Sequence, residues 1–161
     1  MRPNGMKLSR RHRTWFYTSF ILVFVSGLAG LIFHYGFPKG EDQVHPLEPW
    51  ALKVHGAAAM LVLIILGTLI PAHIKKGWKA GLNRRNGVIL ISVNLILIIT
   101  GYLLYYAGGE TFRFISSWIH IVIGLLLPGF IIWHVREGRR ERKKLRHKQH
   151  RIQDNSHSSQ K

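Results

Sequence analysis

Four of the ten histidines lie inside long apolar stretches, where a titratable ring is unexpected. They are His55, His73, His120 and His134. An imidazole in a membrane-spanning helix is costly unless it is paired, so each such residue is a candidate functional site. Neutral imidazole binds iron, zinc, copper and nickel, and it also forms hydrogen bonds. The sequence therefore predicts either a metal or cofactor site, or hydrogen bonds between helices.

The spacing of these histidines groups them into two pairs. His55 and His73 are 18 residues apart, a whole number of helical turns, so they share one helix face about 27 Å apart along the axis. His120 and His134 are 14 residues apart, which places them within roughly 40° of one face with a rise of about 21 Å. Each stretch therefore presents two imidazoles on one face, near opposite ends.

The two pairs also match in depth at one end. His73 precedes Lys75 by two residues, and His134 precedes Arg136 by two. If both stretches cross the membrane in the same direction, these two rings lie at the same depth. At the other end, the two spacings differ by four residues, so His55 and His120 are predicted to differ in depth by about 6 Å.

The elements that must position these rings are four long apolar blocks separated by short polar segments. The predicted helices cover residues 15–36, 49–75, 87–107 and 112–136. Each is long enough to cross a hydrocarbon core of about 30 Å, and short connections make consecutive helices antiparallel neighbours. We therefore expect an all-α, integral membrane, up-down four-helix bundle over residues 15–135, between a basic arm (1–14) and a basic tail (136–161).

The positive charge is explained by topology. The net charge of +16 would suit nucleic-acid binding, but Lys and Arg crowd into the two ends and the loop after the second helix. That distribution follows the positive-inside rule and predicts a multi-pass membrane protein with both termini cytoplasmic. Membrane lipid, and not nucleic acid, is the expected partner of the basic segments. The tail is expected to be a short helical extension that becomes disordered from about Gln153.

Two facing histidine pairs at two depths would suit two haem groups, each with histidine on both axial positions. The expected outer pair is His55 with His120, and the expected inner pair is His73 with His134. Such iron has no open coordination position, which favours electron transfer over oxygen chemistry. Because the chain has no cysteine, iron–sulfur clusters and covalently attached c-type haem are excluded.

Two further histidines lie near the outer end. His34 closes the first apolar block and His45 follows in the first loop. Either could replace His55 or His120 as an outer ligand, or serve in proton release. Alternatively, His34 lies at the membrane interface and binds no haem.

The segments LKVHGAAAMLVLIILGTLIPAHIKKGW and SSWIHIVIGLLLPGFIIWHV carry a family resemblance. Over roughly residues 12–138 the chain resembles the small membrane cytochromes b, the group that contains cytochrome b561 and the cytochrome b subunits of hydrogenase and formate dehydrogenase. The resemblance implies two non-covalent haem b groups and electron transfer between a quinone and a partner redox protein. The chain would then be a component of a membrane oxidoreductase and not a stand-alone enzyme. Glu48 or His45 could accept a quinol proton on the outer side.

Two rival functions compete with this prediction. In the first, the chain is a haem-free scaffold or assembly protein whose histidines only form hydrogen bonds between helices. In the second, it is a transition-metal transporter, since imidazole also suits zinc, copper and nickel. No Asp or Glu lies inside an apolar block, so the transporter is the weaker rival.

Overall fold

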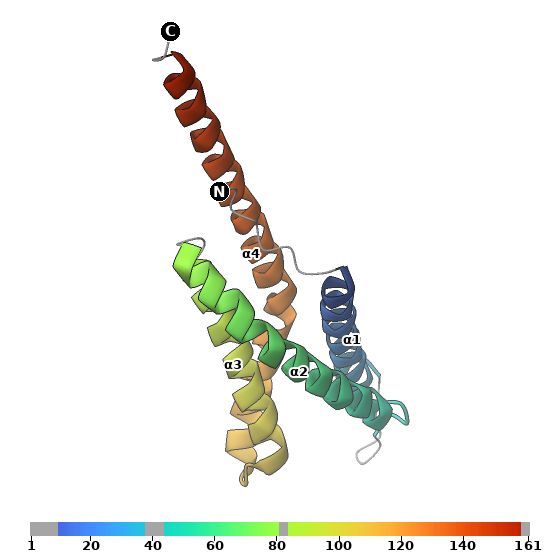
Figure 1. Ribbon diagram of the computed structural model, residues 1–161. Helices are drawn as coiled ribbons and strands as arrows, with labels where there is room; N and C mark the ends of the chain where they lie inside the picture. Colours follow the sequence, from blue (N-terminus) through green and yellow to red (C-terminus); the bar gives the residue numbers. More distant parts are fainter. Residues whose placement is uncertain (1–9, 38–43, 81–83, 159–161) are drawn as a thin grey trace. The chain divides into compact units, whose positions relative to one another are not determined.

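All regular structure in the described part of the chain is helical. The computed structural model describes the backbone of residues 10–37, 44–80 and 84–158, and the side chains of these residues except 10–13, 69–80, 154 and 156–158. The helices are α1 (Arg10–Tyr35), α2 (Glu48–Ala80), α3 (Arg84–Tyr106) and α4 (Glu110–Ser158), as labelled in Figure 1. The predicted all-α class is therefore confirmed for the described residues.

The chain forms two compact units, residues 1–76 and 77–161, and each is described by itself. In the first, the C-terminal half of α1 contacts the first two turns of α2. Gly30 makes room for this approach, because a β-carbon there would lie 3.4 Å from Cδ2 of Leu52. In the second, α3 and α4 pack side by side as an antiparallel pair (Figure 1).

A glycine turn joins α3 to α4. Gly109 has a φ of 93°, a left-handed conformation in which a β-carbon is strained. Its carbonyl accepts a hydrogen bond from the amide of Arg113 at 3.2 Å, at the start of α4. The turn is thus short enough to keep the two helices in contact.

Each helix contains a stretch that is long and apolar enough to cross a membrane. These stretches are Thr14–Tyr35, Glu48–Thr68, Arg84–Tyr106 and Glu110–Gln153. Large apolar side chains on them are exposed, with Ile21 at 63%, Met60 at 64% and Ile132 at 51%. Helices that expose apolar side chains to this extent need an apolar environment around them. A lipid bilayer is the environment that their length and composition fit.

Polar side chains within these stretches bond to their own helix. The Ser26 hydroxyl donates to the carbonyl of Leu22 at 2.6 Å, and the Thr100 hydroxyl donates to that of Ile96 at 2.7 Å. The Asn94 amide likewise donates to a carbonyl four residues earlier at 2.8 Å. These bonds satisfy donors that hydrocarbon would leave unpaired.

Most helix ends lie beyond the predicted bounds, whereas α1 and α3 each end one residue earlier than predicted. Helix α1 begins at Arg10 instead of residue 15, and α4 continues to Ser158 instead of ending near 136. The disorder predicted from Gln153 is therefore wrong as far as Ser158. Arg, Lys, Glu, Gln and Leu dominate this extension and are good helix formers. Glu137 and Arg140 add an ion pair of 3.5 Å on adjacent turns.

Candidate functional site

His55 lies on α2 against α1, the other helix of the first unit. Its Nδ1 is 2.9 Å from the carbonyl oxygen of Val23, and 3.5 Å from the hydroxyl oxygen of Ser26. The shorter contact has good hydrogen-bond geometry, whereas the longer one is at the limit. His55 is therefore held mainly by the backbone carbonyl.

Gly27 makes this position possible. A β-carbon at Gly27 would lie 2.9 Å from both Cε1 and Nδ1 of His55, and 3.8 Å from Nε2. No real β-carbon tolerates the two shorter contacts, so any other residue at this position would displace the ring. The Cε1–Nδ1 edge of the imidazole faces α1, and Nε2 lies farther from it.

His120 has matching surroundings in the second unit. Its Nδ1 is 2.9 Å from the hydroxyl oxygen of Thr100 on α3, and Thr100 is only 5% exposed. A β-carbon at Gly101 would lie 3.4 Å from Cε1 and 3.8 Å from Nδ1 of the ring. The same edge of the imidazole faces the neighbouring helix, again beside a glycine.

The two units therefore repeat one local arrangement. In each, a histidine lies against a hydroxyl-bearing residue followed by glycine, Ser26-Gly27 in one and Thr100-Gly101 in the other. These dipeptides were not predicted to be functional from the sequence. Their repetition in two apolar blocks is the signal that could have pointed to them.

His134 also lies against α3. A β-carbon at Gly87 would be 3.9 Å from its Cε1, which is ordinary van der Waals contact. Gly87 precedes Gly101 by 14 residues, the same interval that separates His120 from His134. His120 and His134 thus each lie opposite a glycine of α3. The side chain of His73 is outside the described residues, as is that of Lys75, so the inner pairing stays a prediction.

Two other histidines gather at the far end of the first unit. His34 Nδ1 is 2.6 Å from Oε1 of Glu48, whose side chain is only 11% exposed. His34 lies seven residues beyond Gly27 on α1, about 10 Å along the axis. It is therefore on a different level of the unit from His55, and it bonds to a carboxylate instead of a carbonyl.

His45 packs at the start of α2. Its ring stacks on Phe33 at 4.7 Å and lies 4.8 Å from the ring of Phe37. Its Nδ1 accepts from the amide of Leu47 at 3.3 Å, and its carbonyl accepts from that of Glu48 at 2.9 Å. Through these contacts, His45 stabilises the N-terminus of α2.

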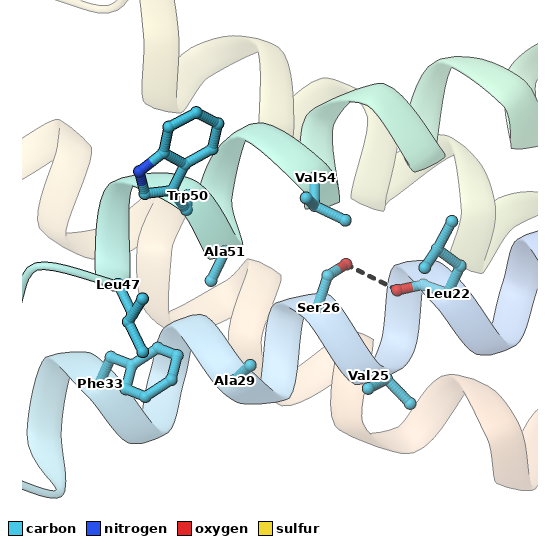
Figure 2. Close-up of a pocket in the computed structure, with 9 residues that line it drawn as sticks. All are labelled: Leu22, Val25, Ser26, Ala29, Phe33, Leu47, Trp50, Ala51 and Val54. Carbon is cyan, nitrogen blue, oxygen red and sulfur yellow. Dashed lines mark hydrogen bonds between the residues drawn. The ribbon is translucent and has the colours of Figure 1, made fainter.

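A groove of about 330 Å³ lies between α1 and α2. Figure 2 shows its lining: Ala29 and Ala51 lie at its middle, with Phe33, Leu47 and Trp50 towards one end and Leu22, Val25, Ser26 and Val54 towards the other. The lining is apolar except for Ser26, whose hydroxyl bonds to Leu22 (Figure 2). Two alanines facing each other leave the space. One end of the groove is thus at Ser26, which lies beside His55. The other end is at Phe33 and Leu47, which directly precede His34 and Glu48 in the sequence.

Among the residues whose side chains are described, no three His, Asp or Glu side chains come together as a metal site. A haem iron takes two protein ligands, so this finding does not test the predicted haem sites. The predicted pairs also combine residues of both units, and they stay predictions. A β-carbon at Gly124 would lie 3.9 Å from Cδ2 of Leu97, as in ordinary helix packing.

The chain was compared with protein-family models, with curated proteins and with solved structures, and none of the three comparisons gave a match.

We predict that Gly27→Ala displaces the His55 ring and breaks its bond to Val23, because the added β-carbon would lie 2.9 Å from two ring atoms. The expected cost is about 1 kcal/mol of stability. The measurement is the ring-nitrogen NMR spectrum of protein labelled with ¹⁵N-histidine. Gly67→Ala is the control, since a β-carbon there has nothing within 4 Å. An unchanged His55 signal in Gly27→Ala would show that the ring does not lie against this glycine.

Proposed function

We propose that the chain is a membrane cytochrome b of the cytochrome b561-like group, which carries electrons across the bilayer between two haem b groups. In this proposal the four helices form an up-down bundle in the bacterial inner membrane. His55 and His120 bind the outer haem, and His73 and His134 bind the inner haem. Electrons pass between a quinone and a partner redox protein.

The observation that carries the proposal is the way in which His55 and His120 are held. The carbonyl of Val23 can only accept a hydrogen bond, so the Nδ1 of His55 must be the donor at 2.9 Å. The Thr100 hydroxyl oxygen lies 2.7 Å from the carbonyl oxygen of Ile96 and 2.9 Å from Nδ1 of His120, and we propose that it donates to Ile96 and accepts from the ring. In this proposal both rings are in the Nδ1–H tautomer, with the lone pair on Nε2. Histidines that bind metals typically have this second hydrogen bond.

The residues present fit a haem in their donor chemistry. Each proposed outer ligand turns its Cε1–Nδ1 edge to a glycine of the adjacent helix, and the Nε2 lone pair is directed away from that edge. Haem would supply one-electron chemistry at iron. The protein residues bind it, fix the ring orientation and exclude water, since the surrounding helix faces are apolar.

The groove between α1 and α2 is the proposed quinone site. The groove is apolar, as a quinone ring and tail require. Ser26 lines the groove, and its hydroxyl oxygen lies 3.5 Å from Nδ1 of His55. Glu48 and His34 follow the groove residues Leu47 and Phe33 in sequence. In this arrangement the buried Glu48 carboxylate, bonded to His34, accepts one of the two protons that oxidation of a quinol releases, and the other leaves to solvent.

A haem-free scaffold is the second candidate, and the same hydrogen bonds favour it. Imidazoles that bond to a carbonyl and a hydroxyl on adjacent helices would stabilise each helix pair without any cofactor. Such bonds contribute about 0.6 kcal/mol on average in membrane proteins. Loss of one histidine would remove a haem from a cytochrome, whereas a haem-free scaffold has no haem to lose.

Replacement of the histidines should reveal pairs. His55→Ala and His120→Ala should each leave one haem per chain, and the double variant should lose no more, because residues that share one site are not additive. His73→Ala and His134→Ala should behave alike at the other haem, while His55→Ala with His134→Ala should remove both. Haem is counted against protein in purified samples, with His45→Ala as the control that keeps two. If His34→Ala removes a haem and His55→Ala does not, the outer ligand is misassigned.

Reporter fusions should show both termini inside. Alkaline phosphatase fused after Gly40, a position outside the described residues, should be active, because the first loop is proposed to face the periplasm. A green fluorescent protein fused after Lys161 should fluoresce, since the basic tail is proposed to stay in the cytoplasm. The reverse pattern would invert the orientation and exchange the outer and inner haems.

Filling the groove should block quinol oxidation without loss of haem. Ala51→Phe places a ring where Ala51 and Ala29 leave space, so the rate of haem reduction by a quinol analogue should fall at least tenfold. Ala57→Phe is the matched control, since Ala57 is exposed on α2 and does not line the groove. Equal rates of haem reduction in the two variants would show that the quinol does not bind in the groove.

A further inference from the structure

Thr100 differs from its counterpart Ser26 in one respect that bears on the histidine beside it. Both hydroxyls donate to a carbonyl of their own helix, at 2.7 Å for Thr100 and 2.6 Å for Ser26. The Thr100 oxygen lies 2.9 Å from Nδ1 of His120, whereas the Ser26 oxygen is 3.5 Å from Nδ1 of His55. His55 uses the Val23 carbonyl instead. The short contact of Nδ1 is thus with a side chain at His120 and with the backbone at His55.

Thr100 therefore forms the middle of a short chain of hydrogen bonds. With His120 in the Nδ1–H tautomer, its Nδ1–H donates to the Thr100 oxygen, and Thr100 donates to the carbonyl of Ile96. Consecutive hydrogen bonds polarise one another in a medium of low dielectric constant. Thr100 is 5% exposed, so water does not compete for its oxygen. The donor bond to Ile96 makes that oxygen a better acceptor for the imidazole proton.

We infer that Thr100 is a positioning residue that holds His120 in the Nδ1–H tautomer and, when iron is bound at Nε2, lowers the reduction potential of that haem. An acceptor on Nδ1–H raises the basicity of the ligand nitrogen. A more basic ligand stabilises ferric over ferrous iron. The first part of the inference concerns the protein alone, and the second rests on the proposed function.

The test compares Thr100→Val, which keeps the shape and removes the hydroxyl, with Thr100→Ser, which restores it. Ser26→Ala is the matched control, because His55 bonds mainly to a carbonyl that this substitution leaves in place. The first readout is the ring-nitrogen NMR spectrum of the haem-free protein labelled with ¹⁵N-histidine. Thr100→Val should move His120 towards the Nε2–H tautomer, and the other two variants should not change any histidine tautomer.

The second readout is a redox titration of the haem-loaded protein. Thr100→Val should raise the midpoint potential of one haem and leave that of the other unchanged. Thr100→Ser and Ser26→Ala should keep the wild-type midpoint potentials of both haems. An unchanged His120 tautomer in Thr100→Val overturns the inference whether or not haem is bound, and equal shifts in Ser26→Ala and Thr100→Val also overturn it. If the tautomer shifts in a chain that binds no haem, the proposed function fails while the positioning role of Thr100 stands.

Discussion

An imidazole inside an apolar helix must have its polar atoms satisfied, and this requirement organises both helix pairs. Water cannot supply the acceptor for Nδ1–H in hydrocarbon, so the adjacent helix has to supply it. In one unit the partner of Nδ1 is the Val23 carbonyl, and in the other it is the Thr100 hydroxyl. The approach of His55 in turn requires a glycine at position 27, because a β-carbon there would lie 2.9 Å from two ring atoms, whereas a β-carbon at Gly101 would lie 3.4 Å from the ring of His120.

This constraint links structure to function through the second ring nitrogen. Once Nδ1 carries the proton, Nε2 carries the lone pair, and the ring is oriented by the helix that holds it. Structural hydrogen bonding and metal binding therefore do not compete for the same atom. The scaffold and the cytochrome interpretations share the first bond and differ only in the use made of the second nitrogen.

The helices themselves were predictable because membrane-spanning length is a strong signal. Four apolar blocks of sufficient length predicted four helices without any knowledge of their contacts. The ends were not predictable to the same degree. Hydrophobicity stops near Arg136, but helix propensity does not, and α4 continues through its basic extension to Ser158.

The site was predictable in part. An imidazole at His55 or His120 is conspicuous among apolar residues, so the histidines could be identified from the sequence. Their partners could not be identified, because a Ser or Thr in an apolar helix usually bonds to its own backbone. Only the packing of one helix on another shows that Thr100 also bonds to His120. The Glu48 bond to His34 likewise depends on two helix ends that meet only in the folded unit.

The most direct test of the central claim is the reduced-minus-oxidised absorption spectrum of the purified protein, with haem and protein measured in the same sample. The account predicts the spectrum of six-coordinate, low-spin haem b and two haems per chain. A chain that is correctly inserted and stably folded, yet shows no haem absorption after expression with ample haem supply, would contradict it.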